Sequence, residues 1–310
     1  MFLLFVKYNI MNLVIIMYTI KVGKNEQIKS INEAINLINE ETTIILMDEE
    51  YREKVVIDKP YVTIDGQNKA TIIFNDSANV IHKDGRPYVT FRTYTMLIKA
   101  PHVTLKNLTI INDAGEGKDV EQAVALHLYN DDIHCINCSL IAHQDTLFCG
   151  PFSPDLIERY VDLLPEDERI HKGEFHQYFT SCYIAGTVDF IFGGASALFT
   201  NCTIESLPCE TDTYICAPDH DKENNHGMIF RNCRIIKHKD TRDNSVYLAR
   251  PWREYGMVHF ENCYLDSHIK KEGFSIWSGT DRHLNCRFYE SNSYGPGKSN
   301  ETRISWSHIK

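Results

Sequence analysis

Short segments in which apolar and polar residues alternate recur along most of the chain, and they are rich in Val, Ile, Tyr and Phe. Five of them contain Asn-Cys and a sixth contains Ser-Cys, while "LKNLTI" around Asn107 is a copy without cysteine. Alternation with a period of two predicts β-strands, and strand-rich units of this length predict a solenoid of stacked coils. The last five repeat cysteines are spaced by 20, 31, 30 and 23 residues; the six are Cys138, Cys182, Cys202, Cys233, Cys263 and Cys286.

The repeat predicts an all-β fold, a parallel β-helix, because no long amphipathic helix joins the units. In such a fold each coil places the same repeat position at the same point of the cross-section. We therefore expect the cysteines to stack in the interior as small apolar groups, and the asparagines to form a hydrogen-bonded ladder at the bends. Cys135-x-x-Cys138 leaves a metal or redox role open, although no second pair follows at zinc-site spacing.

Two segments depart from the repeat. Residues 28–41 carry the only helical pattern, with Ser30 as a candidate N-cap, and we expect this short helix to cover the open end of the solenoid. Residues 151–176 contain no repeat and have two prolines near their start, which predicts an insertion that loops out of one coil.

The domain organisation is predicted to be simple, since no boundary appears within residues 17–310. The chain begins with two apolar runs, each shorter than a membrane span and without a signal-peptide cleavage pattern. We expect residues 1–16 to be a disordered lead or the product of a start codon assigned too far upstream. We expect a monomer in the cytoplasm, where many free cysteines are stable, with secretion as the alternative.

The net charge of −10 over 310 residues argues against a nucleic-acid-binding surface. An acidic polymer would be repelled by the same charge. A site for such a substrate therefore needs local cations or aromatic rings.

The cysteine repeat also brings two carboxylates into phase. Asp145 lies seven residues after Cys138, and Asp189 lies seven residues after Cys182 in the apolar run "VDFIFGG". If the insertion only loops out, the two occupy equivalent places on neighbouring coils, about 5 Å apart. Two carboxylates that close titrate as a pair, which can produce an acid and a nucleophile or base. Asp240 has the same spacing from its cysteine, but its charged surroundings predict a solvated loop.

Candidate partners for this pair lie in nearby motifs. Arg250 begins "RPW", where Pro251 fixes the turn and Trp252 offers a flat face for a sugar ring. A guanidinium can bind a carboxylate through two parallel hydrogen bonds. Gln144 precedes Asp145, and Gln122 opens the preceding strand; amide donors of this kind stabilise a developing oxyanion.

Four segments, "QAVAL", "HQDTL", "GTVDFIFGGA" and "YLARPW", occur in this order and resemble the signature segments of pectin methylesterases. The resemblance covers residues 17–310. It implies a right-handed parallel β-helix without a metal or an organic cofactor. The implied reaction is hydrolysis of the methyl esters of polygalacturonate (pectin) or its oligomers, giving carboxylate and methanol.

The resemblance also implies a role for each site residue. Asp189 would be the nucleophile, and Asp145 the general acid and then the base that activates water. Gln122 and Gln144 would stabilise the oxyanion, and Arg250 would hold Asp189 ionised. Aromatic positions that match the family's sugar-binding cleft are Phe148, Phe192, Tyr247, Trp252 and Trp277.

The chain departs from the family pattern at several positions. Ala249 replaces a usual glycine, "FRTYTML" replaces a small-residue run, and the insertion at 151–176 is longer than in plant-like members and resembles bacterial ones. Three alternatives remain: a retaining glycosidase, which also uses carboxylates about 5 Å apart, a thioesterase-like relative, and a non-catalytic carbohydrate-binding β-helix.

Overall fold

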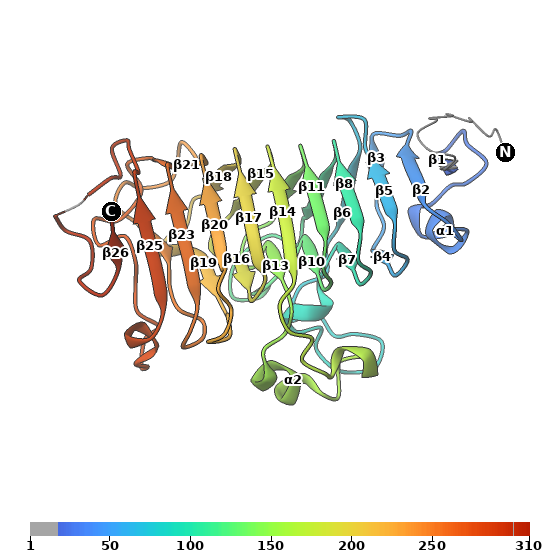
Figure 1. Cartoon of the computed structure of the whole chain (residues 1–310). Helices are drawn as coiled ribbons and strands as arrows, with labels where there is room; N and C mark the ends of the chain where they lie inside the picture. Colours follow the sequence, from blue (N-terminus) through green and yellow to red (C-terminus); the bar gives the residue numbers. More distant parts are fainter. Residues whose placement is uncertain (1–17, 300) are drawn as a thin grey trace, which may run out of the picture.

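The computed structural model describes residues 18–299 and 301–310, and it is a parallel β-helix, as the repeat predicted (Figure 1). The predictions for residues 1–16 concern a segment outside this part. Each coil contributes strands to three parallel sheets that run along the solenoid. Among the residues described, no helix is long and apolar enough to cross a membrane.

The largest sheet has eleven strands. In spatial order they are β1 (Tyr18–Val22), β2 (Thr42–Leu46), β5 (Val62–Asp65), β8 (Val103–Lys106), β11 (Ile133–Ile136), β14 (His176–Thr180), β17 (Ser196–Thr200), β20 (Met228–Arg231), β23 (Met257–Glu261), β25 (Arg287–Ser291) and β26 (His308–Ile309).

The second sheet has eight strands, namely β24 (Tyr264–Leu265), β21 (Arg234–Lys237), β18 (Thr203–Ser206), β15 (Tyr183–Gly186), β12 (Ser139–Ile141), β9 (Thr109–Asn112), β6 (Thr71–Phe74) and β3 (Glu50–Tyr51). The third has seven and carries the candidate site. Its strands are β22 (Val246–Ala249), β19 (Thr213–Pro218), β16 (Val188–Gly193), β13 (Leu147–Cys149), β10 (Leu126–Leu128), β7 (Met96–Ile98) and β4 (Val55–Ile57).

The repeat cysteines pack in the interior, as predicted. Cys202, Cys233 and Cys263 are at most 1% exposed, and each Sγ lies 3.2–3.5 Å from a backbone oxygen of the preceding coil. All ten cysteines are free thiols. Within the described ranges no group of His, Cys, Asp or Glu side chains is arranged to hold a metal ion. The cysteines therefore act as small apolar core residues.

The repeat asparagines serve mainly as turn residues rather than as the side-chain ladder predicted from the sequence. Five of the six adopt left-handed backbone angles, with φ from 54° to 57° at Asn107, Asn201, Asn232 and Asn262 and 52° at Asn137. The copy at Cys286 differs: Asn285 has φ of −118°, and the strand after it belongs to the eleven-stranded sheet rather than to the eight-stranded one. Asn tolerates this conformation better than most residues. In the part of the chain described, the side-chain ladder is limited to Asn137, which donates to Asn107 at 3.0 Å and to Asn68 at 2.7 Å.

A stack of four phenylalanines fills the core beside the cysteines. Phe179, Phe199, Phe230 and Phe260 have successive ring centroids 4.4, 4.4 and 4.7 Å apart. All four rings are fully buried. The stack continues across four coils. It stabilises the register of the coils through side-chain contacts, in addition to the backbone hydrogen bonds between strands.

Replacing Phe230 by Ala should lower the free energy of unfolding by about 3–5 kcal/mol, since it leaves a cavity between two stacked rings. Leu284→Ala provides the matched control, because Leu284 is 69% exposed and loses little on truncation. Chemical denaturation followed by circular dichroism measures both changes. Equal midpoints for the two variants would contradict a core role for the stack.

The end helix and the insertion differ from their predictions in extent. Helix α1 is Ile31–Asn36, shorter than the pattern over 28–41, since the chain turns at Leu37 to enter β2; Ser30 caps it by accepting from the Glu33 N–H at 3.1 Å. The insertion loops out between β13 and β14, as predicted, but it contains a helix that the sequence pattern did not indicate (Figure 1). The remaining short elements are α2 (Pro154–Tyr160), η1 (Thr90–Arg92), η2 (Glu166–Glu168) and η3 (Arg282–Leu284).

Candidate active site

The two in-phase carboxylates lie on neighbouring coils, as the cysteine spacing predicted. Leu147 of β13 pairs with Ile191 of β16. Asp145 lies two residues before Leu147 and Asp189 two residues before Ile191, so the same register aligns the two carboxylates. The Asp145 N–H donates to the Val188 backbone oxygen at 3.1 Å, and this hydrogen bond joins the two neighbouring coils. The insertion at 151–176 does not change this register, because it begins only after β13 is complete.

Irregular backbone presents both carboxyl groups. Asp145 has φ of 64° and Asp189 has φ of 48°, which are left-handed values. The pairing of β16 with β19 shifts register between Val188 and Ile191, so Asp189 lies on a bulge of one extra residue. Bulges and left-handed residues are common where a fold re-aims a side chain at a functional site. Asp189 can thus leave an apolar strand whose other residues remain in the core.

Arg250 binds Asp189 through two hydrogen bonds. Its Nε donates to Oδ1 at 2.9 Å and its Nη2 donates to Oδ2 at 2.5 Å. The guanidinium also lies between two rings, 3.9 Å from the Tyr214 centroid and 4.3 Å from that of Trp277. Two aromatic faces and a bidentate carboxylate fix a planar cation in position and orientation.

Burial raises the pKa of both carboxyl groups, and Arg250 opposes this rise most strongly at Asp189. Asp145 is 8% exposed, and burial together with the charge of Asp189 raises its pKa well above the usual range. Burial also raises the pKa of Asp189, but its hydrogen bonds and attraction to Arg250 oppose that effect. The geometry therefore favours a protonated Asp145 beside an ionised Asp189, since Arg250 stabilises the charge on Asp189 directly.

The two glutamines lie beside this pair on successive coils. The Ala123 N–H donates to the Gln144 backbone oxygen at 3.2 Å, which joins the strand start of Gln122 to the turn of Asp145. Both glutamines are half-buried, and their side-chain amides make no hydrogen bond to other described residues. Their N–H groups are free to donate to a substrate oxygen.

The predicted aromatic positions fall into two groups. Tyr247, Trp252 and Trp277 are half-buried and keep exposed ring surface for a sugar. Phe148 and Phe192 are only 0% and 2% exposed. These two positions do not fit the predicted role of direct substrate contact, because neighbouring rings cover them.

The covering rings come from loops outside the strands. Phe91 and Phe152 lie 5.0 and 5.2 Å from the Phe148 ring centroid, and Trp252 lies 5.7 Å from that of Phe192. Phe148 and Phe192 therefore support the floor of the site. The exposed aromatic surface is provided by the residues packed over them.

Tyr214 was not predicted from the sequence. It pairs in register with Tyr247, and the two rings stack at 5.4 Å. Tyr214 lies 12 residues after Cys202, whereas Tyr247 lies 14 after Cys233, so the cysteine ruler does not align them. The turn from β18 to β19 is shorter than the turn from β21 to β22, so this pairing could not be predicted from the cysteine spacing.

Replacing Arg250 by Lys should raise the pKa of Asp189, because a single ammonium group cannot reproduce the bidentate contact that stabilises its charge. Asp189 must be ionised to attack, so the acidic limb of the kcat/KM profile should move to higher pH. The pH dependence of ester hydrolysis measures this shift. An acidic limb at the wild-type pH, with activity retained, would contradict the role given to Arg250.

Comparison with known proteins gives one consistent family. The pectinesterase family model matches residues 19–151 and 167–310. An Arabidopsis thaliana protein described as "Probable pectinesterase/pectinesterase inhibitor 21" is 30% identical over 92% of this chain. The chain spans only 40% of that relative's length. Relatives of this kind come from plants, so the resemblance of the insertion to bacterial members gains no support from them.

Solved structures agree with the family match. A pectin methylesterase from Yersinia enterocolitica is 28% identical, with a TM-score of 0.74 over 91% of this chain and 93% of its own. A pectin methylesterase solved in complex with a hexasaccharide is 25% identical, with a TM-score of 0.76 over 94% and 93% of the two chains. The family model covers nearly the whole described solenoid except part of the insertion. The chain therefore belongs to the pectinesterase family.

Proposed function

We propose that the protein hydrolyses the methyl esters of polygalacturonate or its oligomers, releasing methanol and leaving a carboxylate. The observation that carries the proposal is the pairing of a buried, in-phase Asp145 with an Asp189 held by Arg250 through hydrogen bonds of 2.9 and 2.5 Å. Acid, nucleophile and cation lie in one place, on the outer face of the seven-stranded sheet. Family membership supports the substrate class.

In the first half of the proposed reaction, Asp189 attacks the ester carbonyl carbon. The amide N–H groups of Gln122 and Gln144 stabilise the oxyanion that forms. As the intermediate collapses, the carbon–oxygen bond to the methoxy group breaks, and Asp145 donates its proton to the departing oxygen. Methanol leaves, and the uronyl group remains joined to Asp189 as an anhydride.

In the second half, Asp145 is ionised and acts as the base. It removes a proton from water, which attacks the acyl carbon and breaks its bond to Asp189. The product leaves as the carboxylic acid and ionises by releasing its proton to bulk water, while Asp189 is again ionised and Asp145 is again protonated. Both carboxyl groups return to their initial states without any other reagent.

The competing activities predict different products. A glycosidase shortens the polymer, a thioesterase requires a thioester substrate, and a binding module releases nothing. Two carboxylates suffice for a glycosidase, whereas Arg250 and the two free amides suit acyl transfer. We keep the cytoplasm as the proposed location, with secretion as the alternative.

The test is the product balance on highly methyl-esterified pectin. We expect methanol and new carboxylate in equal amounts, with no fall in polymer length by size-exclusion chromatography. Shortened chains without methanol would favour the glycosidase. Folded protein that releases neither product but cleaves an acyl thioester would favour the thioesterase-like relative.

A further inference from the structure

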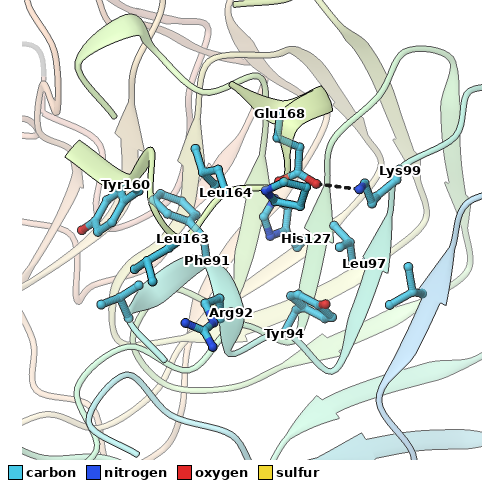
Figure 2. Close-up of a pocket in the computed structure, with 13 residues that line it drawn as sticks. Phe91, Arg92, Tyr94, Leu97, Lys99, His127, Tyr160, Leu163, Leu164 and Glu168 are labelled. Carbon is cyan, nitrogen blue, oxygen red and sulfur yellow. Dashed lines mark ion pairs between the residues drawn. The ribbon is translucent and has the colours of Figure 1, made fainter. Parts of the chain in front are cut away.

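A cavity of about 290 Å³ lies against β4, β7 and β10 of the seven-stranded sheet (Figure 2). Its floor is formed by Val56 of β4, Leu97 of β7 and His127 of β10. His127 pairs in register with Phe148 of β13, which in turn pairs with Phe192 of β16. The cavity therefore continues the row of side chains that leads to the carboxylate pair.

The insertion closes this cavity from above. Tyr160, Leu163 and Leu164 line it together with Phe91 and Arg92 from the loop before β7 (Figure 2). The two loops hold each other, since the Tyr160 and Phe91 rings lie 5.4 Å apart and Arg86 donates to the Asp162 backbone oxygen at 3.1 Å. Residues 152–166 fall outside the match to the family model. The closed end is thus built largely by a segment outside the family model.

The cavity has little free charge. Lys99 is paired with Glu168 at 3.0 Å, and Arg92 with Asp84 at 2.8 Å. His127 is neutral, because burial lowers its pKa to about 3. A carboxylate entering the cavity would lose its hydration without gaining an unpaired cation, which is unfavourable. An uncharged, partly apolar group fits better.

His127 is part of the cavity wall but presents no polar atom to the cavity. The side chain is 1% exposed, and in the described structure neither ring nitrogen makes a hydrogen bond of ordinary geometry. The nearby Phe91 backbone opposes part of the pKa decrease that burial causes. A buried polar group without a partner is costly. Both ring nitrogens are covered by neighbouring atoms, so His127 contributes ring surface to the cavity wall rather than a hydrogen-bonding group.

We propose that this cavity is a chain-end subsite that takes one terminal, methyl-esterified uronosyl residue of a short oligogalacturonide. The inference rests on the proposed function for the substrate class. The insertion stops the chain at this end of the cleft, so esters are hydrolysed at a fixed short distance from one terminus. Long polymers bind only through their ends, and oligomers are the better substrates per ester group.

Two variants test the subsite. Leu163→Trp fills the cavity from the half-buried insertion wall, and KM for a methylated trigalacturonide should rise about 10-fold or more with kcat nearly unchanged. Leu284→Trp, at a 69% exposed position, is the matched control and should leave KM unchanged.

Binding is measured by calorimetry in the Asp189→Asn background, with the fully methylated trimer and the unmethylated trimer as probes. We expect the methylated trimer to bind at least about 10-fold more tightly, and Leu163→Trp to remove that preference. Absence of methanol release together with Leu163-dependent binding would overturn the proposed function but not the subsite. Unchanged binding in Leu163→Trp, or methanol release at scattered positions along an oligomer, would overturn the subsite even if esterase activity is present.

Discussion

Replacing Asp189 by Asn should lower kcat for methyl ester hydrolysis by about 10⁴-fold or more, the scale seen when a covalent nucleophile is removed. The amide keeps the size of the side chain but cannot attack the ester carbonyl. Arg250 would then face a neutral group, so binding should change less than catalysis. Initial rates of methanol release, measured at saturating substrate, give the ratio directly.

Asp240→Asn is the matched control for this experiment. Asp240 lies seven residues after Cys233, as Asp189 lies seven after Cys182, but it is exposed in a loop. The control should retain wild-type activity, and both variants should show the wild-type circular dichroism spectrum. A folded Asp189→Asn protein with near wild-type kcat would contradict the nucleophile assignment.

Replacing Asp145 by Asn should lower kcat for the methyl ester by about 10²–10⁴-fold, because it removes the proton donor for methanol and the base for water. An ester with a more acidic alcohol needs no proton to leave. With such a substrate the variant should release a burst of alcohol close to the enzyme concentration, and then turn over slowly. The same kcat loss for both esters, without a burst, would contradict the acid role of Asp145.

The repeat made the pair predictable from the sequence. In a solenoid each coil repeats the cross-section, so equal counts from Cys138 and Cys182 place Asp145 and Asp189 side by side. Asp240 also lies seven residues after its cysteine, but it is not part of a site. Its neighbours in the sequence are charged, and it lies in a turn rather than in an apolar strand. Phase combined with apolar context therefore predicted the carboxylates, and the motif "RPW" predicted their cation.

Contacts made by irregular segments were not predictable in this way. Phe148 was expected to line the sugar-binding cleft, yet Phe91 and Phe152 cover it from two loops. Tyr214 was missed because the turn before β19 has its own length. A repeat fixes strands, whereas loop lengths and loop packing follow no period. The repeat asparagines are a different case. Their position at the bends was predicted correctly, but most of them occupy it because asparagine tolerates left-handed backbone angles, and not because their side chains pair.

The central claim is that the ester passes through an acyl intermediate on Asp189. Hydroxylamine competition tests it most directly, with a methylated oligogalacturonide as substrate and the Asp189→Asn variant as the background control. We predict that the wild type forms a uronyl hydroxamate in proportion to hydroxylamine, and that hydroxamate and carboxylate together equal the methanol released. Methanol matched by carboxylate alone at every hydroxylamine concentration would contradict the account.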